Sequence, residues 1–306
     1  MKLAHWIEGA AARGAVRLLR LLGPVRASNL CGAIARTLGP LVPESRIADT
    51  NLRLAMPELD AEARRRVIRG VWENLGRTVG EFPHVSRLRE CAEGPGWEVV
   101  GAEHVDALAR QGGPAILFTG HIGNWEVLPV ATARNDVRFA AMYRPVDNKV
   151  INDLILDLRR EAVRDGEARL FPKGAQGARQ VLSHLRNGGF IGMLQDQKMN
   201  DGIEARFFGR PAMTASALAV LALRLRCPVM PTYVYRTAPA RFRVTYEAPL
   251  PLPDSGDRAA DVAALTQAVN DRLEAWIRAK PESWLWLHRR WPKEVYQPGS
   301  ATLALV

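Results

Sequence analysis

The chain has 306 residues, of which 47% are hydrophobic and 24% are charged, so it can bury a full-sized core and is not disordered throughout. Its 42 lysines and arginines exceed its 32 acidic residues, and the formal net charge of +10 favours polyanionic partners such as lipid head groups, acidic proteins or nucleic acid. Three scattered cysteines exclude a disulfide framework and a cysteine metal cluster.

The first segment of the chain predicts an amphipathic helix over residues 3–22. Its apolar residues fall on one stripe of a helical wheel and its arginines on the opposite side. The two sets are Ile7, Ala11, Ala15, Leu18 and Leu22, and Arg13, Arg17 and Arg20. This layout is typical of a helix lying in a bilayer interface, although a helix packed on its own protein has the same stripe. We predict a helical, membrane-associating arm over residues 1–43, with neither a spanning helix of ~20 apolar residues nor a secretory signal.

Helices and then alternating elements follow this arm. Residues 44–90 predict helices, and an apolar stripe comprises Val67, Val71, Leu75 and Val79. From Gly94 onward, short apolar runs alternate with amphipathic segments, which predicts an α/β fold with a mixed central sheet flanked by helices. The expected strands are Ala115–Thr119, Arg138–Tyr143, Phe190–Leu194, Val229–Val234 and Arg241–Tyr246. The expected helices are 124–134, 148–165, 175–187, 213–226 and a last one running from Val262 to Ile277.

One strand, turn and helix carry the residues that point to chemistry. The strand ends at Thr119, and the glycines at 120 and 123 allow a tight turn and a close approach to a ligand. Asn124 suits a helix N-cap. His121 therefore lies at the carboxyl edge of a strand, where α/β sheets place their ligands.

Glu126 follows His121 by five residues and is predicted to fold back toward the imidazole. A carboxylate on one ring nitrogen fixes the tautomer, and the other nitrogen can then take a proton from a hydroxyl. This is the base-and-orienter half of a catalytic triad, with the substrate's own hydroxyl as the nucleophile. A lone histidine is more often structural, but the glycine-flanked turn and the nearby carboxylate favour a catalytic pair.

The segment Gly-His-Ile-Gly-Asn-Trp-Glu, residues 120–126, resembles a known signature. Histidine followed by four residues and an acid is typical of the glycerolipid acyltransferase superfamily. The form with Glu resembles its lipid A late acyltransferase (lauroyl/myristoyl acyltransferase) branch. Further segments resemble the family in the same order over about residues 45–292. They are Tyr143-Arg144-Pro145 with Asn148, Gly177-Ala178-Arg179, Gln195-Asp196-Gln197, Phe207-Phe208-Gly209, and Pro281-Glu282 with Trp286-Leu287-His288-Arg289-Arg290.

The resemblance implies an O-acyltransferase whose catalytic domain spans residues 44–306. In that family a fatty acyl chain moves from acyl carrier protein to a hydroxyl of a lipid A precursor, without a metal or a resident cofactor. His121 would be the general base and Glu126 its partner. Backbone N–H groups near Gly120 to Gly123, or a nearby arginine, would stabilise the oxyanion formed at the thioester carbonyl.

Four residues are predicted to bind substrate. Arg159 falls where the family has a functional arginine, although its neighbour Arg160 leaves the register open by one. Asp196 matches the family's aspartate after the third strand, within Asp-Gln where some members have Asp-His. Arg144 would hold a phosphate or sugar carboxylate, with a surface salt bridge as the alternative, and Asn124 completes the set.

The expected partners are acyl carrier protein, a lipid A precursor and an anionic membrane surface at the cytoplasmic face of the cell inner membrane. One alternative is the same chemistry with acyl-coenzyme A on another glycolipid such as a phosphatidylinositol mannoside. A second is a non-catalytic, basic, membrane-associated lipid-binding protein. A nucleic-acid partner is not expected, because no binding motif is present and the basic residues are not clustered with stacking aromatic residues.

Overall fold

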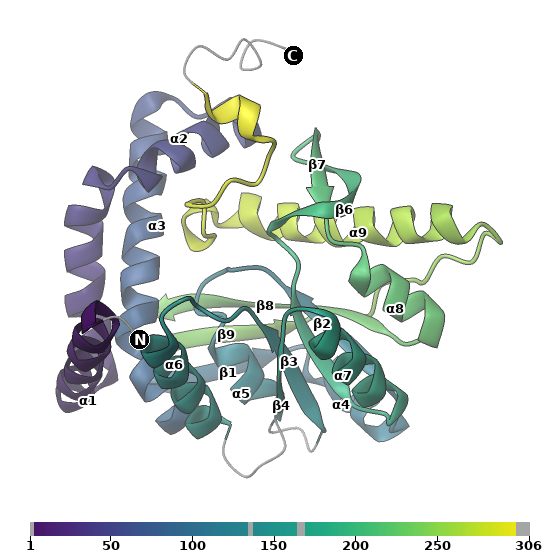
Figure 1. Ribbon diagram of the computed structural model, residues 1–306, viewed down its shortest axis with the longest axis horizontal. Helices are drawn as coiled ribbons and strands as arrows, with labels where there is room; N and C mark the ends of the chain where they lie inside the picture. Colours follow the sequence, from purple (N-terminus) through teal and green to yellow (C-terminus); the bar gives the residue numbers. More distant parts are fainter. Residues whose placement is uncertain (1–2, 134–136, 164–168, 298–306) are drawn as a thin grey trace.

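A seven-stranded sheet in the order β1-β9-β8-β2-β5-β3-β4 lies at the centre of the computed structural model, which describes residues 3–133, 137–163 and 169–297 (Figure 1). Its strands are β1 (Gly96–Val100), β2 (Ala115–Thr119), β3 (Phe139–Tyr143), β4 (Arg169–Pro172), β5 (Phe190–Leu194), β8 (Val229–Ala238) and β9 (Arg241–Tyr246). Neighbouring strands pair in parallel, except that β8 and β9 are antiparallel. The predicted mixed sheet is therefore confirmed, and parallel pairing dominates it.

Strand β2 is buried on both faces. Ile116 and Phe118 belong to one hydrophobic core, and Ala115 and Leu117 belong to the other. Because side chains alternate across a strand, a strand covered on both sides reads as a continuous apolar run. This is why the bounds predicted for β2 agree with the structure, as do those predicted for β5 and β9.

Helices cover both faces of the sheet (Figure 1). They are α4 (Ala102–Gln111), α5 (Val127–Ala133), α6 (Lys149–Ala162), α7 (Ala175–Arg186), α8 (Ala217–Leu225) and α9 (Arg258–Ala279). Leu185 of α7 and Leu273 of α9 pack in the first core, and Leu108 of α4 and Val130 of α5 pack in the second. Short 3-10 helices are η1 (Gly39–Leu41), η2 (Phe82–Arg87), η3 (Pro281–Ser283) and η4 (Lys293–Tyr296).

Four strands were not predicted from the sequence. Strands β1 and β4 are the two edges of the sheet, and β4 has only four residues. Strands β6 (Lys198–Phe207) and β7 (Arg210–Thr214) form a separate antiparallel hairpin. The first half of β6 is polar and mostly exposed or half-buried, so it has no apolar alternation to recognise.

Several predicted helix bounds differ from the structure at their ends. Helix α8 begins at Ala217 rather than at residue 213, because Met213 and Thr214 pair with β6. Helix α5 begins at Val127, three residues later than expected. The last residues of the predicted helices 124–134 and 148–165 lie outside the described residues.

The buried face of helix α3 (Ala61–Glu81), which follows α2 (Glu44–Ala55), differs from the predicted stripe. Val71 is buried as expected, but Val79 is 55% exposed, and the charged Glu81 is fully buried. The reason is close packing against α1, since a Cβ at Gly80 would lie 2.4 Å from the carbonyl oxygen of Ala27.

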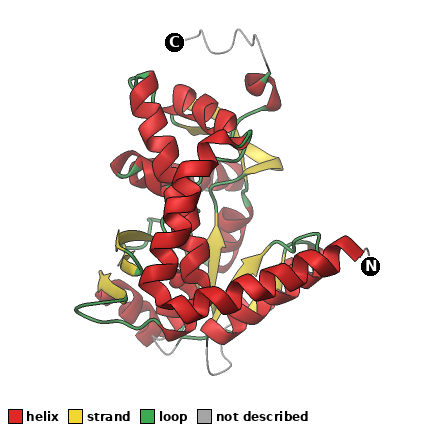
Figure 2. Ribbon diagram, turned by 90° about the vertical axis from the view of Figure 1, so that its left-hand side faces the viewer, coloured by secondary structure: helices red, strands yellow, loops and turns green. Residues whose placement is uncertain are grey.

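The N-terminal arm is a long helix, α1 (Leu3–Leu38), which kinks at Gly23 and packs along α3 and α6 (Figure 2). Ile7 and Leu18 are exposed as predicted, but Arg20 turns toward the protein and pairs with Glu161 at 2.5 Å. An apolar surface along α1 faces away from the protein. It comprises Trp6, Ile7, Leu18, Leu21, Val25, Leu30, Ile34 and Leu38. Within the described residues, no helix combines the length and hydropathy needed to cross a bilayer.

Candidate active site

His121 lies in the loop that connects β2 to α5, at the carboxyl edge of the sheet. Gly123 takes a left-handed backbone conformation with φ of 59°, and a Cβ there would lie 2.1 Å from the carbonyl oxygen of Val234. Glycine is the residue that tolerates both conditions. The backbone N–H of Gly123 donates to the carbonyl of Ser283 at 2.9 Å, so the loop is also held by the C-terminal segment.

The imidazole of His121 is held by Asp196. Its Nδ1 lies 2.9 Å from Oδ1 and 3.1 Å from Oδ2 of Asp196, and the backbone N–H of His121 donates to Oδ2 at 2.8 Å. Asp196 is fully buried, whereas the His121 side chain keeps 15% of its surface exposed. The two residues meet because β2 and β5 pair in parallel with Thr119 opposite Leu194, so that the residues after each strand emerge side by side.

The predicted contact between Glu126 and His121 is wrong, because the carboxylate of Glu126 has a different partner. Glu126 instead forms a bidentate ion pair with Arg159, with Nε to Oε2 at 2.9 Å and Nη2 to Oε1 at 2.6 Å. The planar guanidinium matches a carboxylate in this way, so the arginine on α6 draws Glu126 away from the ring. Asp196, predicted to bind substrate, is the carboxylate that fixes the imidazole, and a catalytic role for Glu126 stays a prediction.

The electrostatics of this pair suit a general base. Burial alone would lower the pKa of His121, but the charge and hydrogen bond of Asp196 and the charge of Glu126 outweigh it and raise that pKa above its ordinary 6.5. Burial likewise opposes ionisation of Asp196, yet the charge and hydrogen bonds of His121 hold the pKa of Asp196 far below its usual range. Asp196 is therefore a carboxylate that accepts the Nδ1 proton. No hydrogen bond within the described residues occupies Nε2 of His121, so this nitrogen can act as the base.

Three backbone N–H groups of the His121 loop already have acceptors. Those of residues 121, 122 and 123 donate to Asp196, to the carbonyl of Gly120 and to the carbonyl of Ser283, respectively. These three groups are therefore not available for an oxyanion in this conformation, and the predicted backbone arrangement stays a prediction for the N–H of Gly120. Arg159 remains, because its Nε and Nη2 bind Glu126 and, in the part of the chain that the structure describes, Nη1 has no partner.

An apolar cavity lies next to the His121 loop, with a free volume of about 790 Å³ that includes its opening to solvent; Thr119, Trp125 and Glu126 line it, and His121 itself does not. Trp125 connects the two, because its ring contacts His121 edge-on with ring centroids 4.9 Å apart and also lines the cavity. Glu126, Tyr143 and Arg159 supply polar groups to the same wall. The rest of the wall is largely apolar and includes Phe82, Leu128, Val130, Phe139, Ala141, Ala162 and Met193. An apolar space close to a base suits a hydrocarbon chain.

The other predicted substrate-binding residues lie in different environments. Arg144 is exposed and follows Tyr143, which lines the cavity, and its contact with an anionic acceptor stays a prediction. Arg159 faces the site, while Arg160 is on the surface and pairs with Asp157 at 3.1 Å, which settles which of the two arginines lies there. Asn124 is fully buried and does not line the cavity.

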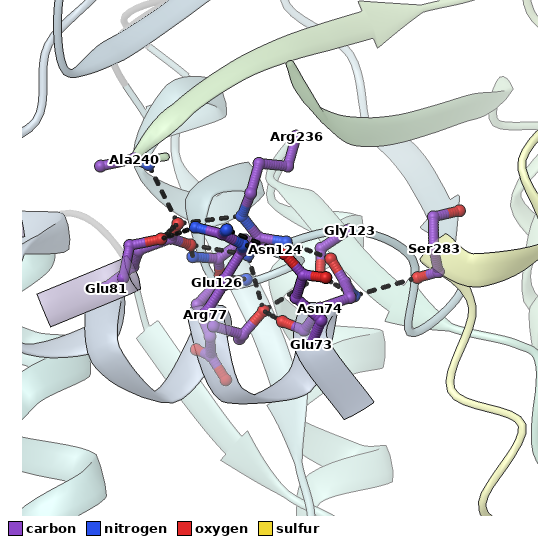
Figure 3. Close-up of polar contacts among 12 residues, drawn as sticks. Glu73, Asn74, Arg77, Glu81, Gly123, Asn124, Glu126, Arg236, Ala240 and Ser283 are labelled. Carbon is purple, nitrogen blue, oxygen red and sulfur yellow. Dashed lines mark hydrogen bonds and ion pairs between the residues drawn. The ribbon is translucent and has the colours of Figure 1, made fainter. Parts of the chain in front are cut away.

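Asn124 belongs to a buried polar network centred on Glu81 (Figure 3). Its Nδ2 donates to Glu81 at 2.9 Å, and its Oδ1 accepts from the backbone N–H of Glu126 at 3.3 Å. Because α5 begins at Val127, this second bond lies in the turn ahead of the helix, and Asn124 is not the N-cap residue that was predicted. Arg236 donates to the two oxygens of Glu81 at 2.9 and 2.7 Å. Asn124 therefore supports the loop and does not reach the cavity.

The Glu81 network was missed from the sequence. Glu81 also accepts from the hydroxyl of Ser28 at 2.7 Å and from the backbone N–H of Ala240 at 3.0 Å, so it ties α1 and the β8–β9 turn to the loop. Arg236 lies 155 residues away from Glu81 in the chain. No local pattern reveals that pair, although an acidic residue next to the apolar stripe of a predicted helix was a signal for a buried partner.

Comparisons with known proteins agree with the sequence motifs. The family model described as bacterial lipid A biosynthesis acyltransferase matches residues 2–293. A phosphatidylinositol mannoside acyltransferase of Mycobacterium tuberculosis is 25% identical over 205 residues, which are 66% of this chain and 62% of that protein. The protein of the same name in Mycolicibacterium smegmatis is 21% identical over 289 residues, which are 94% of this chain and 92% of the relative. The match to the family model confirms the resemblance on which the predicted chemistry rests.

Proposed function

Because the chain belongs to the bacterial lipid A biosynthesis acyltransferase family, we propose that it transfers a fatty acyl group from a thioester to a hydroxyl of a phosphorylated glycolipid. The first candidate reaction uses acyl carrier protein as the donor and a lipid A precursor as the acceptor. The observation that carries the proposal is the His121–Asp196 pair beside an apolar cavity, with Arg159 on the same wall.

The chemistry needs no group beyond these side chains. Nε2 of His121 takes the proton of the acceptor hydroxyl as its oxygen attacks the thioester carbonyl, a step that general bases accelerate by roughly 10² to 10⁴. The carbonyl oxygen becomes an oxyanion, toward which Nη1 of Arg159 can donate. When the tetrahedral intermediate collapses, the C–S bond breaks, and the leaving thiolate takes the proton from the imidazolium. Asp196 stays ionised throughout and stabilises the imidazolium.

The relatives favour a second candidate acceptor. Both bear the name phosphatidylinositol mannoside acyltransferase. This name fits the alternative acceptor predicted from the sequence, for which acyl-coenzyme A is the expected donor. The two candidates share the base, the cavity and an anionic acceptor. They differ in what carries the acyl chain and in which alcohol receives it.

The site of action that we propose is the cytoplasmic face of the inner membrane. The apolar surface of α1 supports membrane association, since Leu21 is 85% exposed and Leu18 is 57% exposed, and exposed apolar side chains along a helix are typical of interfacial binding. Arg13, Arg17 and Arg26 are exposed on the same helix and can contact lipid phosphates. Residues 1–43 would form the membrane-associating arm and residues 44–306 the catalytic domain.

The test is an in vitro assay that crosses two donors with two acceptors. Purified protein is incubated with acyl carrier protein or coenzyme A thioesters, and with a lipid A precursor or a phosphatidylinositol mannoside in vesicles, and products are followed by mass spectrometry. We expect acylated lipid A precursor with the carrier-protein donor, and the opposite pair would favour the second candidate.

His121→Ala is the control variant in this assay. It should abolish turnover while leaving vesicle binding and the unfolding temperature close to those of the wild type. If the wild type bound vesicles but gave no product in all four combinations of donor and acceptor, the result would favour a non-catalytic lipid-binding protein.

A further inference from the structure

The C-terminal segment around Trp284 lies directly against the His121 loop. Trp284 pairs with Ile122 in an antiparallel β-bridge, and the backbone N–H of Leu285 donates to the carbonyl of His121 at 3.1 Å. The segment thus adds a short stretch of extended backbone beside the loop. Its side chains are brought to the site by this pairing, more than 150 residues after His121 in the chain.

The indole of Trp284 completes the hydrogen bonding of Asp196. Its Nε1–H donates to Oδ2 of Asp196 at 2.8 Å, on the oxygen that also accepts the backbone N–H of His121. Trp284 is fully buried, and its ring packs edge-on against Phe207 and Trp286, with ring centroids 5.7 and 4.6 Å away. The hydrogen bonds that Asp196 accepts within the described residues thus come from His121 and Trp284, apart from a long contact of its own carbonyl with His288 at 3.4 Å.

From this arrangement we propose that Trp284 is a positioning residue that, through Asp196, sets the orientation and basicity of His121. The inference rests on the proposed function, in which His121 is the base. The physical reason is that a hydrogen bond donated to a carboxylate stabilises its negative charge and lowers its affinity for a second proton donor. Without the indole N–H, Asp196 draws more strongly on the Nδ1 proton and favours the imidazolium.

Several other charged or titratable groups lie near His121 and Asp196, and some of them also affect the pKa of His121. Asp196, Glu126 and Arg159 face the imidazole of His121. His288 lies close to Asp196, and burial lowers the pKa of this second histidine. Arg290 is fully buried, but its guanidinium donates to the carbonyl of Met213 and the hydroxyl of Thr214, not to Asp196. None of these groups replaces a donor removed from Oδ2.

Trp284→Phe removes the donor and keeps an aromatic ring, and Trp286→Phe is its matched control. Trp286 is also fully buried and also loses an indole hydrogen bond, but that bond goes to the backbone carbonyl of Pro281 at 2.8 Å. The dependence of kcat/KM on pH is measured for both variants and for the wild type with the pair of substrates that the wild type uses best. We expect the midpoint of the acidic limb to rise by about half a unit or more in Trp284→Phe and to stay in place in Trp286→Phe.

A purely structural role predicts a different result. Activity would then fall in both variants with no change in midpoint, and that outcome would overturn the proposal. Direct titration of the His121 imidazole by NMR in the full chain, assigned with His121→Ala, gives the same comparison without turnover. A failure of the proposed function can therefore be told apart from a failure of the Trp284 proposal. In the first case the wild type would give no product, but the titration of the His121 imidazole would still report the effect of Trp284.

A second measurement keeps the proposal testable if Trp284→Phe does not fold. In the wild type, the indole N–H resonance of Trp284 should shift with pH together with the titration of His121, while that of Trp286 should not. An indole signal of Trp284 that is indifferent to the titration of His121 would contradict the coupling.

Discussion

Asp196→Asn removes the charge behind His121 and changes the side chain by a single group. In the wild type, the two carboxylate oxygens accept from Nδ1 of His121, from its backbone N–H and from the indole of Trp284. An asparagine has only one accepting oxygen and turns a donating NH₂ toward at least one of these donors. The imidazole should therefore be less well oriented, and the imidazolium should be less stable.

The magnitude follows from what Asp196 contributes to His121. Burial lowers the pKa of His121, and the Asp196 charge and hydrogen bond are the leading effects that reverse this. Without them, the imidazole is a weaker base, and the intermediate that holds its proton is less stable. We expect kcat to fall by about 10² to 10⁴, which corresponds to roughly 3 to 5 kcal/mol of transition-state stabilisation. The pKa of His121 should move to the opposite side of its ordinary value.

The assay is acyl transfer followed by mass spectrometry as a function of pH, with Glu126→Gln as the comparison. We expect the acidic limb of the Asp196→Asn profile to move to lower pH while its plateau falls. In Glu126→Gln the ion pair with Arg159 is lost, but the hydrogen bond on Nδ1 remains, so the limb should move less. A profile of Asp196→Asn with the wild-type midpoint and plateau would refute the assignment of Asp196 to the base.

Three further predictions concern the wild-type profile, the buried network and the cavity. Because the pKa of His121 is raised, and the base must be neutral, kcat/KM should fall as pH drops through a value above 6.5, whereas an unperturbed imidazole would place this midpoint at 6.5 itself. Glu81→Gln leaves Arg236 buried without its counter-charge and should lower the free energy of unfolding in urea by about 3 kcal/mol. Glu62→Gln, which breaks an exposed pair with Arg66, should change it by less than about 1 kcal/mol. Ala141→Leu adds apolar volume to the cavity wall and should shift the preference among acyl donors toward shorter chains, and unchanged chain-length selectivity would place the acyl chain elsewhere.

The sequence by itself determined the elements that depend on local pattern. Strand β2 could be recognised because both of its faces are buried, and the glycines and Asn124 marked the turn after it. The motif around His121 was sufficient to predict the family that the comparisons confirm. All of these features depend on residues that are close together in the sequence, so they can be predicted without knowing the tertiary structure.

The tertiary structure decided which groups meet at the histidine. Asp196 and Trp284 lie 75 and 163 positions beyond His121, and only the parallel pairing of β2 with β5 and the β-bridge at Ile122 bring them there. Glu126, close in sequence, is drawn away by Arg159 because α6 places a guanidinium opposite it. Sequence spacing limits which residues can reach one another along a helix, but contacts between elements depend on sheet order and packing. The identity of the imidazole's partner therefore became visible only in the folded chain.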